Sequence, residues 1–206
     1  QKSLQAKEKK LFKDGFFKDK KVFVMGSSWE SDEEVMLPAL IKLMEYDPNI
    51  ITIIVPHEPT ELHIESTEQT LIGKFDSIRF SYLNNYQGER VIIIDSIGIL
   101  LTLYTYAHAA YVGGSFKQGV HNILEPAVYG IPILFGPKYE NSQEAIKLAE
   151  IGGGIVVRNK KEAYKNLRKI FTNEKLRLSL GNICADYVKE NTGATSKILN
   201  EIYKFI

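Results

Sequence analysis

The sequence predicts an α/β domain built on a Rossmann-like, doubly wound parallel sheet. From Lys20 onward, short runs of β-branched and other apolar residues alternate with segments of helical spacing. Several runs, such as residues 50–55, are apolar almost throughout, which is typical of parallel strands covered on both faces. Alternation of this kind gives a sheet with helices on both sides.

The elements are expected in a simple alternating order. The helix at 32–46 carries acids in its first turn and Pro38, which we expect to bend it. Glycines at 152–154 should stop the helix before them. The expected strands are residues 22–25, 50–55, 77–82, 91–94, 109–112, 133–135 and 155–158. The other expected helices are a segment ending near Gly73, residues 98–107, 123–129 and 142–151, and three later segments, the last from about Thr195.

Composition excludes several classes of function. Hydrophobic residues make up 44% and charged residues 25% of the 206 residues, and the formal net charge is +1. No global basic field therefore points to nucleic acid. The single cysteine, Cys184, excludes an internal disulfide framework and a thiolate metal cluster, and its helical setting indicates a buried structural thiol.

Metal binding and membrane insertion are not expected either. The four histidines have no carboxylate at ligand spacing, so no metal site is predicted, and His63 and His108 are expected to have packing or surface roles. The most apolar stretch, residues 91–112, is interrupted by Asp95 and His108 and falls short of the roughly 18 apolar residues of a membrane span. We expect a soluble chain.

Polar and glycine residues follow the expected strands. Because the carboxyl ends of parallel strands meet at one edge of a sheet, where such folds bind ligands, these residues are candidates for a site. They are residues 26–28, 56–58, 95–96, 113–115 and 136–137.

The most informative stretch is residues 111–130. An apolar run ends in Gly113 and Gly114, and Asn122 and Glu125 then open a short helix that Gly130 closes. This layout puts bare backbone and helix amides at a strand end, where an α/β protein can hold a phosphate. Glu125 is within reach of a hydroxyl-rich ligand. The pattern is typical of the sugar-nucleotide site of a glycosyltransferase.

Together these motifs resemble the 3-deoxy-D-manno-octulosonic acid (Kdo) transferases of lipopolysaccharide synthesis, over nearly all residues after about Lys20. There are departures: an arginine expected between Pro56 and His57 is missing, Ile99 replaces an acid, and Lys117 is a basic residue at a shifted position. The matching pieces are Gly26, Ser27 and Ser28 with Glu33 and Glu34; Pro56 and His57; residues 95–98; and Gly113–Ser115, His121–Ala127 and Gly130–Pro137.

The resemblance implies the carboxyl-terminal half of a two-domain GT-B glycosyltransferase. Residues 1–19 would be a linker or interdomain helix and residues 20–206 the domain that binds the donor, CMP-Kdo. An amino-terminal acceptor domain, absent from this chain, would supply the catalytic carboxylate, the lipid A precursor site and peripheral association with the cytoplasmic face of the inner membrane. The chain alone would hold the nucleotide sugar but transfer nothing. Kdo transfer would invert the sugar and need no metal or other cofactor.

The donor-binding residues expected on this basis come from three of the strand ends named above, at 26–28, 56–58 and 113–115, and from the segments around residues 121–125 and 141. No catalytic residue is expected in the chain. The donor-binding residues are Gly26, Ser27, Ser28, Pro56, His57, Gly113, Gly114, Ser115, His121, Asn122, Glu125 and Asn141.

Simpler roles compete at several of these positions. Glu125 could bind the ribose hydroxyls or only complete a capping box with Asn122, and we favour both together. Gly113 and Gly114 could be turn glycines, Ser28 or Ser31 a helix cap, and the segment from Asn141 to Glu144 a cap at a second helix.

For the whole protein, the alternatives are a UDP-sugar GT-B glycosyltransferase, a UDP-sugar epimerase, or a non-catalytic nucleotide-sugar binding module.

Overall fold

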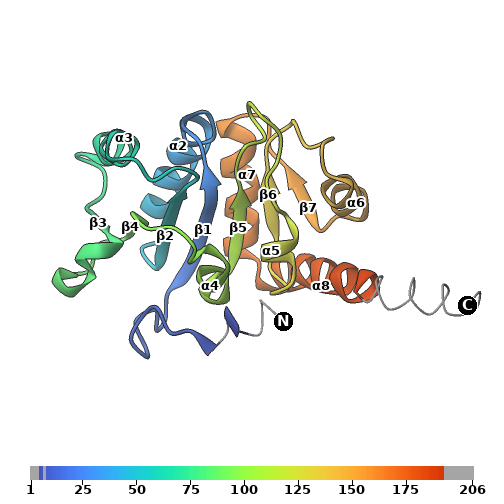
Figure 1. The fold of residues 1–206 in the computed structure, drawn as a ribbon, viewed down its shortest axis with the longest axis horizontal. Helices are drawn as coiled ribbons and strands as arrows, with labels where there is room; N and C mark the ends of the chain where they lie inside the picture. The colour runs from blue at the N-terminus through green and yellow to red at the C-terminus, as the bar shows by residue number, and fades with distance from the viewer. Residues whose placement is uncertain (1–4, 7, 193–206) are drawn as a thin grey trace, which may run out of the picture.

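The computed structural model describes residues 5–6 and 8–192, and confirms the predicted fold. In this part of the chain, seven parallel strands form one sheet in the order β3-β4-β2-β1-β5-β6-β7. Helices cover both faces, with α2 and α7 behind the sheet and α4 and α5 in front of it in Figure 1. The strands are β1 (Lys21–Ser28), β2 (Ile50–Pro56), β3 (Ser77–Arg79), β4 (Val91–Ile93), β5 (Ala109–Val112), β6 (Ile133–Phe135) and β7 (Gly154–Val156).

The helices mostly begin and end close to the expected residues. Ser142 caps α6, and Gly152 ends it in the left-handed conformation at φ 87°, as the glycine run predicted. Pro38 lies inside α2, which continues to Tyr46. The helices are α2 (Glu30–Tyr46), α3 (Glu61–Leu71), α4 (Leu100–Leu103), α5 (Leu124–Ala127), α6 (Gln143–Ile151), α7 (Lys160–Thr172) and α8 (Glu174–Asn191).

The central strands are apolar at successive positions because each face of the sheet has its own core. Phe23 and Met25 of β1 lie in a buried cluster with side chains of α2 and α7. Val22 and Val24 alternate with them and lie in a second cluster with Tyr104. Because successive side chains of a strand point to opposite faces, only a strand covered on both sides needs apolar residues throughout.

Several expected elements are shorter than the sequence predicted, including the strand at 91–94, which ends at Ile93, and the helix at 123–129, which covers only Leu124–Ala127. The strand at 77–82 ends at Arg79 and continues as a 3₁₀ helix, Phe80–Asn85, where Asp95 accepts the N–H of Ser81 at 3.0 Å. The helix at 98–107 begins only at Leu100, because Gly98 has a φ of 81° that no right-handed helix contains, and it becomes a 3₁₀ turn at Tyr104–Tyr106. β7 ends at Val156, opposite Phe135, where its partner strand β6 also ends.

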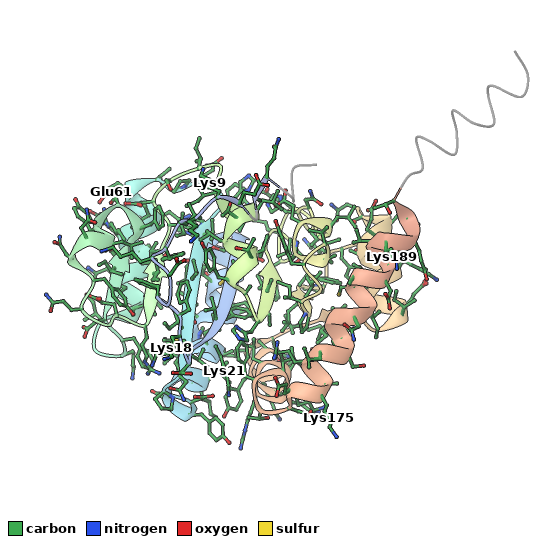
Figure 2. All side chains as sticks on the ribbon, turned by 90° about the horizontal axis from the view of Figure 1, so that it is seen from below. Lys9, Lys18, Lys21, Glu61, Lys175 and Lys189 are labelled. Carbon is green, nitrogen blue, oxygen red and sulfur yellow. The ribbon has the colours of Figure 1, made fainter. Side chains whose placement is uncertain are left out.

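The described ends of the chain pack on the same body. Phe12, from the segment before β1, is buried in the second core cluster, the one that holds Val22, Val24 and Tyr104. In Figure 2, α8 runs along one side of the molecule, with Lys175 near its start and Lys189 near its end. The helix expected from about Thr195 lies outside the described residues. No helix in the described part of the chain has both the length and the apolar character that crossing a bilayer requires.

Strand order places the site. On one side of β1 the neighbouring strands are β2, β4 and β3, and on the other side they are β5, β6 and β7. The chain first builds one side of the sheet and then crosses to the other, so the direction of winding reverses between β1 and β5. In open α/β sheets, ligands bind outside the carboxyl ends of the strands at this reversal. Gly26–Ser28 and Gly113–Ser115 lie there.

Candidate functional site

The ends of β1 and β5 approach each other so closely that only glycine fits. Gly113 donates its N–H to the carbonyl oxygen of Gly26 at 2.9 Å. A Cβ atom on Gly113 would overlap the Ser27 carbonyl and lie 2.8 Å from the Cα of Ser28. Gly114 has a φ of 93°, in the left-handed region that favours glycine. Backbone packing and turn geometry therefore explain the glycine pair.

Asp32, in the first turn of α2, holds the glycine turn at Gly113 and Gly114 in place. It is fully buried, and its Oδ2 accepts the backbone N–H groups of Gly114 at 2.8 Å and of Trp29 at 3.0 Å. Its Oδ1 accepts the hydroxyl of Tyr111 at 2.6 Å. Burial raises the pKa of Asp32, and these hydrogen bonds oppose the rise. The sequence pattern does not indicate this role, because it shows Asp32 only as an acid in the first turn of a helix.

This anchoring changes the expected route to a phosphate. The N–H groups of Gly113 and Gly114 already donate to Gly26 and Asp32, so they are not the bare amides that the sequence suggested. Their direct contact with a donor stays a prediction.

Two of the serines predicted to bind the donor, Ser28 and Ser115, are buried and do not line the cavity described below. Ser28 is buried and donates its hydroxyl to Oε1 of Glu33 at 2.7 Å. Ser115 is buried, and its Oγ accepts the N–H of Gly136 at 2.5 Å. Neither Ser28 nor Ser31 caps α2, whose N-cap is Trp29. Both buried hydroxyls fix strand ends, and their expected donor contacts stay predictions.

Other predicted residues line one open cavity. Ser27, Pro56, His57 and Glu125 lie around a hollow of about 310 Å³ at the carboxyl ends of β1 and β2 and beside α5. Ser27 has a φ of 51°, a strained conformation for a residue that is not glycine and one that clusters at functional sites. The rest of the lining is Val55, Ser96, Ile97, Gly98, Leu100 and Leu101.

Glu125 makes a local contact at the start of α5 and also lines the cavity. Its contact with ribose hydroxyls stays a prediction. The Oδ1 of Asn122 accepts the N–H of Leu124 at 3.1 Å, and its Nδ2 donates to Oε1 of Glu125 at 3.2 Å. Asn122 thus links the first N–H of α5 to the Glu125 side chain, which lines the cavity. The N-cap of α5 is Ile123, with no side-chain cap bond, so the expected capping box of Asn122 and Glu125 is not formed. A carboxylate in such a place can accept hydrogen bonds from two ligand hydroxyls.

Three rings from three strand ends form a stack beside the cavity. The ring centroids of His57 and His121 are 4.2 Å apart, with an interplanar angle of 8°. Trp29 stacks on His57 at 4.7 Å and donates its Nε1–H to Nε2 of His121 at 3.0 Å. Trp29, His57 and His121 are called the ring stack below. Both histidines were expected at the site from the sequence, whereas Trp29 was not.

Asn141 has a structural task. Its Oδ1 accepts the N–H of Val120 at 3.1 Å, and its Nδ2 donates to the carbonyl of the same residue at 3.0 Å. Ser142, one residue later than the expected cap, accepts the N–H of Ala145 and caps α6. Asn141 therefore clamps the loop that carries His121, and its donor contact stays a prediction.

A buried polar network supports the end of β1. Glu33 accepts from Ser28 and from the hydroxyl of Thr67 at 2.7 Å, and its Oε1 lies 3.0 Å from Nε2 of His63. The side chains of His63 and Glu33 are only 8% and 7% exposed. The hydrogen bond to Glu33 raises the pKa of His63, and burial opposes the rise. The packing role expected for His63 is confirmed.

The remaining histidine and the cysteine are also structural. His108 accepts the N–H of Val22 at its Nδ1, at 3.0 Å, and burial lowers the pKa of its ring. Cys184 is buried, with its Sγ 3.2 Å from the carbonyl of Gly153, and burial raises the pKa of this thiol to about 12. Within the described residues, no group of three histidine, cysteine or acidic side chains could hold a metal ion.

Kdo transferases are similar to this chain in sequence. The 3-deoxy-D-manno-octulosonic acid transferase of Haemophilus influenzae is 29% identical over 193 residues, 91% of this chain and 45% of that protein. The transferase of the same name from Aquifex aeolicus is 31% identical over 155 residues, 74% of this chain and 42% of that protein. The resemblance to the Kdo transferases is confirmed. The chain spans less than half the length of these curated relatives.

The fold also has a solved counterpart. The C-terminal CMP-Kdo binding domain of WaaA from Acinetobacter baumannii matches with a TM-score of 0.77 and 22% identity, over 90% of this chain and 97% of that one. At this identity the likeness establishes the fold, which is the Rossmann-like α/β fold found in GT-B glycosyltransferases. No family model matches the sequence.

Proposed function

We propose that the chain is the donor-binding domain of a glycosyltransferase that moves Kdo from CMP-Kdo to a lipid A precursor with inversion. The similarity to Kdo transferases supports the enzyme class. The observation that carries the proposal is the convergence of Ser27, His57 and Glu125 on one cavity at the winding reversal of the sheet. These residues are far apart in sequence, and the resemblance had assigned all of them to donor binding.

The chemistry of the cavity suits a nucleotide. Glu125 offers a carboxylate to the two ribose hydroxyls, while His57 is an exposed imidazole that can donate to a phosphate or carboxylate oxygen. The aliphatic side chains of Ile97, Leu100 and Leu101 form an apolar part of the wall. A pyrimidine nucleoside monophosphate has both the hydroxyls and the anion that these groups require.

In the whole enzyme, donor binding and acceptor binding belong to different domains. Residues 1–19 serve as a linker or interdomain helix, and residues 20–206 bind the donor. A separate amino-terminal domain supplies the acceptor site, the catalytic carboxylate and the association with the cytoplasmic face of the inner membrane. The reaction uses no metal or cofactor. Kdo transfer to a lipid A precursor by the purified chain alone would refute this division.

Calorimetric titration tests the donor. We expect the chain to bind CMP more tightly than UDP, and Glu125→Ala to lose most of the CMP affinity. Preference for UDP would move the assignment to a UDP-sugar transferase or epimerase. Binding of neither nucleotide, by a chain whose fold is verified by circular dichroism, would contradict a self-sufficient donor site.

A further inference from the structure

Trp29 is a central member of the ring stack, yet the proposed function gives it no task. It follows β1 as the N-cap of α2, while His57 follows β2 and His121 lies in the loop after β5. Its indole makes two different contacts: a ring stack on His57 and an N–H bond to His121. One side chain therefore links three strand ends at the proposed donor site.

The bond to His121 fixes the state of that imidazole. Because Nε2 of His121 accepts the indole N–H at 3.0 Å, this nitrogen carries no proton, and the neutral ring holds its hydrogen on Nδ1. Burial lowers the pKa of His121, the charge of nearby His57 adds to this effect, and the carboxylate of Asp32 on α2 opposes it. The geometry and the surroundings both favour a neutral His121.

The ring contacts also fix His57. Its ring lies against the Trp29 indole and is nearly parallel to that of His121. Among the described residues, no hydrogen-bond partner holds its ring nitrogens, and the side chain is exposed at the cavity. In the part of the chain that the structure describes, the only hydrogen bond that holds His57 is made by its backbone, whose N–H donates to the carbonyl oxygen of Ser28 at 2.8 Å. Stacking is therefore the interaction that sets the orientation of the imidazole ring.

We propose that Trp29 is a positioning residue of the donor site, which holds His121 as its neutral Nδ1–H tautomer and aims His57 into the cavity. The role rests on the proposed function, because the cavity is the one assigned to the nucleotide. Of the ring stack only His57 lines this cavity, so Trp29 acts on His57 directly by stacking and indirectly through His121. Ring stacking restricts the freedom of both imidazoles before the ligand arrives, which reduces the entropy lost on binding.

Two variants separate the contacts of Trp29. Trp29→Phe keeps an aromatic face for His57 but removes the N–H that binds His121, and Trp29→Ala removes both. Tyr82→Ala is the matched control, because this ring is 58% exposed and lies outside the lining of the cavity. A ¹⁵N spectrum of the histidine side chains reports tautomer and titration, and calorimetry with CMP reports affinity.

We expect His121 to be the Nδ1–H tautomer in the parent chain and its pKa to rise in Trp29→Phe, because the bond that favours the neutral ring is gone. CMP affinity should fall about fivefold in Trp29→Phe, the cost of ordering one side chain on binding, and further in Trp29→Ala. Tyr82→Ala should match the parent chain in both measurements.

The outcomes that overturn the role are distinct from failure of the proposed function. An unchanged His121 titration and unchanged CMP affinity in Trp29→Phe would overturn the positioning role while leaving donor binding intact. A folded parent chain that binds neither CMP nor UDP would overturn the proposed function, and the donor-site role of Trp29 with it, even where the spectrum shows the expected tautomer. If Trp29→Ala does not fold, Trp29→Phe alone decides.

Discussion

The Oδ2 atom of Asp32 accepts the backbone N–H of Gly114 at 2.8 Å, which ties the first turn of α2 to the glycine turn after β5. The two residues are 82 positions apart in sequence. Together with the hydrogen bonds from Tyr111 of β5 and from Trp29 after β1, this contact joins the ends of β1 and β5, between which the direction of winding reverses. Asp32 therefore determines the shape of the site without lining the cavity.

Replacing Asp32 by Asn should destabilise the chain. The Asn side chain has one acceptor oxygen and one NH₂ group, whereas both carboxylate oxygens of Asp32 accept hydrogen bonds from Trp29, Tyr111 and Gly114. The NH₂ group would face a donor, so at least one of these hydrogen bonds is lost. We expect a loss of about 1–3 kcal/mol in the free energy of unfolding, measured by urea denaturation. Glu34→Gln, an exposed acid on the same helix, should change it by less than about 0.5 kcal/mol. Equal effects of the two variants would contradict the anchoring role.

Gly113→Ala should be more damaging than an alanine at an open glycine. The added Cβ would overlap the Ser27 carbonyl, where two strand ends meet and neither can move alone. We expect a loss of about 3 kcal/mol or more. Gly152→Ala is the control, because its φ is 87° and its Cβ would meet nothing within 4 Å, so only backbone strain of about 1 kcal/mol applies. If Gly113→Ala and Gly152→Ala unfolded at comparable urea concentrations, the ends of β1 and β5 would be able to move apart at little cost.

Cys184 should be unreactive while the chain is folded. Burial raises the pKa of its thiol to about 12, and the thiolate is the form that alkylates. We expect iodoacetamide to label it at neutral pH only in denaturant, as followed by intact mass. Rapid labelling of the native chain would mean that α8 separates easily from Gly153.

Local patterns predicted the strands well, because each apolar run is bounded by residues that break strands. The strands at Ala109–Val112 and Ile133–Phe135 were predicted residue for residue. The site was predicted less completely. The contact between Asn122 and Glu125 follows from their short spacing, although Ile123 and not Asn122 is the N-cap of α5. The link from Trp29 to His121, in contrast, spans 92 positions. A single sequence shows which residues are polar, but it does not show which distant partner each will meet.

The Glu33–His63 pair should make stability depend on pH. The pKa of His63 is raised in the folded chain, so its contribution is fully present below the unfolded value near 6.5 and is lost as pH rises through the folded value. The difference in unfolding free energy between the parent chain and His63→Gln should therefore shrink as pH rises above the unfolded value near 6.5. Urea titrations at several pH values measure it.

His108 provides a control of opposite sign. Burial lowers the pKa of His108, so its contribution is present above the unfolded value and is lost as pH falls through the folded one. The difference between the parent chain and His108→Gln should therefore grow as pH rises. If both differences moved in the same direction, the assigned ionisation of His63 would be wrong.

Glu125 can be tested against a second residue in the same local motif. Asn159 and Glu162 repeat the spacing of Asn122 and Glu125 at the start of α7, where Asn159 accepts the N–H of Glu162 at 2.9 Å and Glu162 lines no part of the cavity. Glu125→Gln should weaken CMP binding by about tenfold or more, because a charged acceptor for the ribose hydroxyls becomes neutral. Glu162→Gln should lower stability by about 1 kcal/mol or less and leave affinity unchanged. Should both variants lose stability alike and bind CMP like the parent chain, Glu125 would only support the local structure at the start of α5.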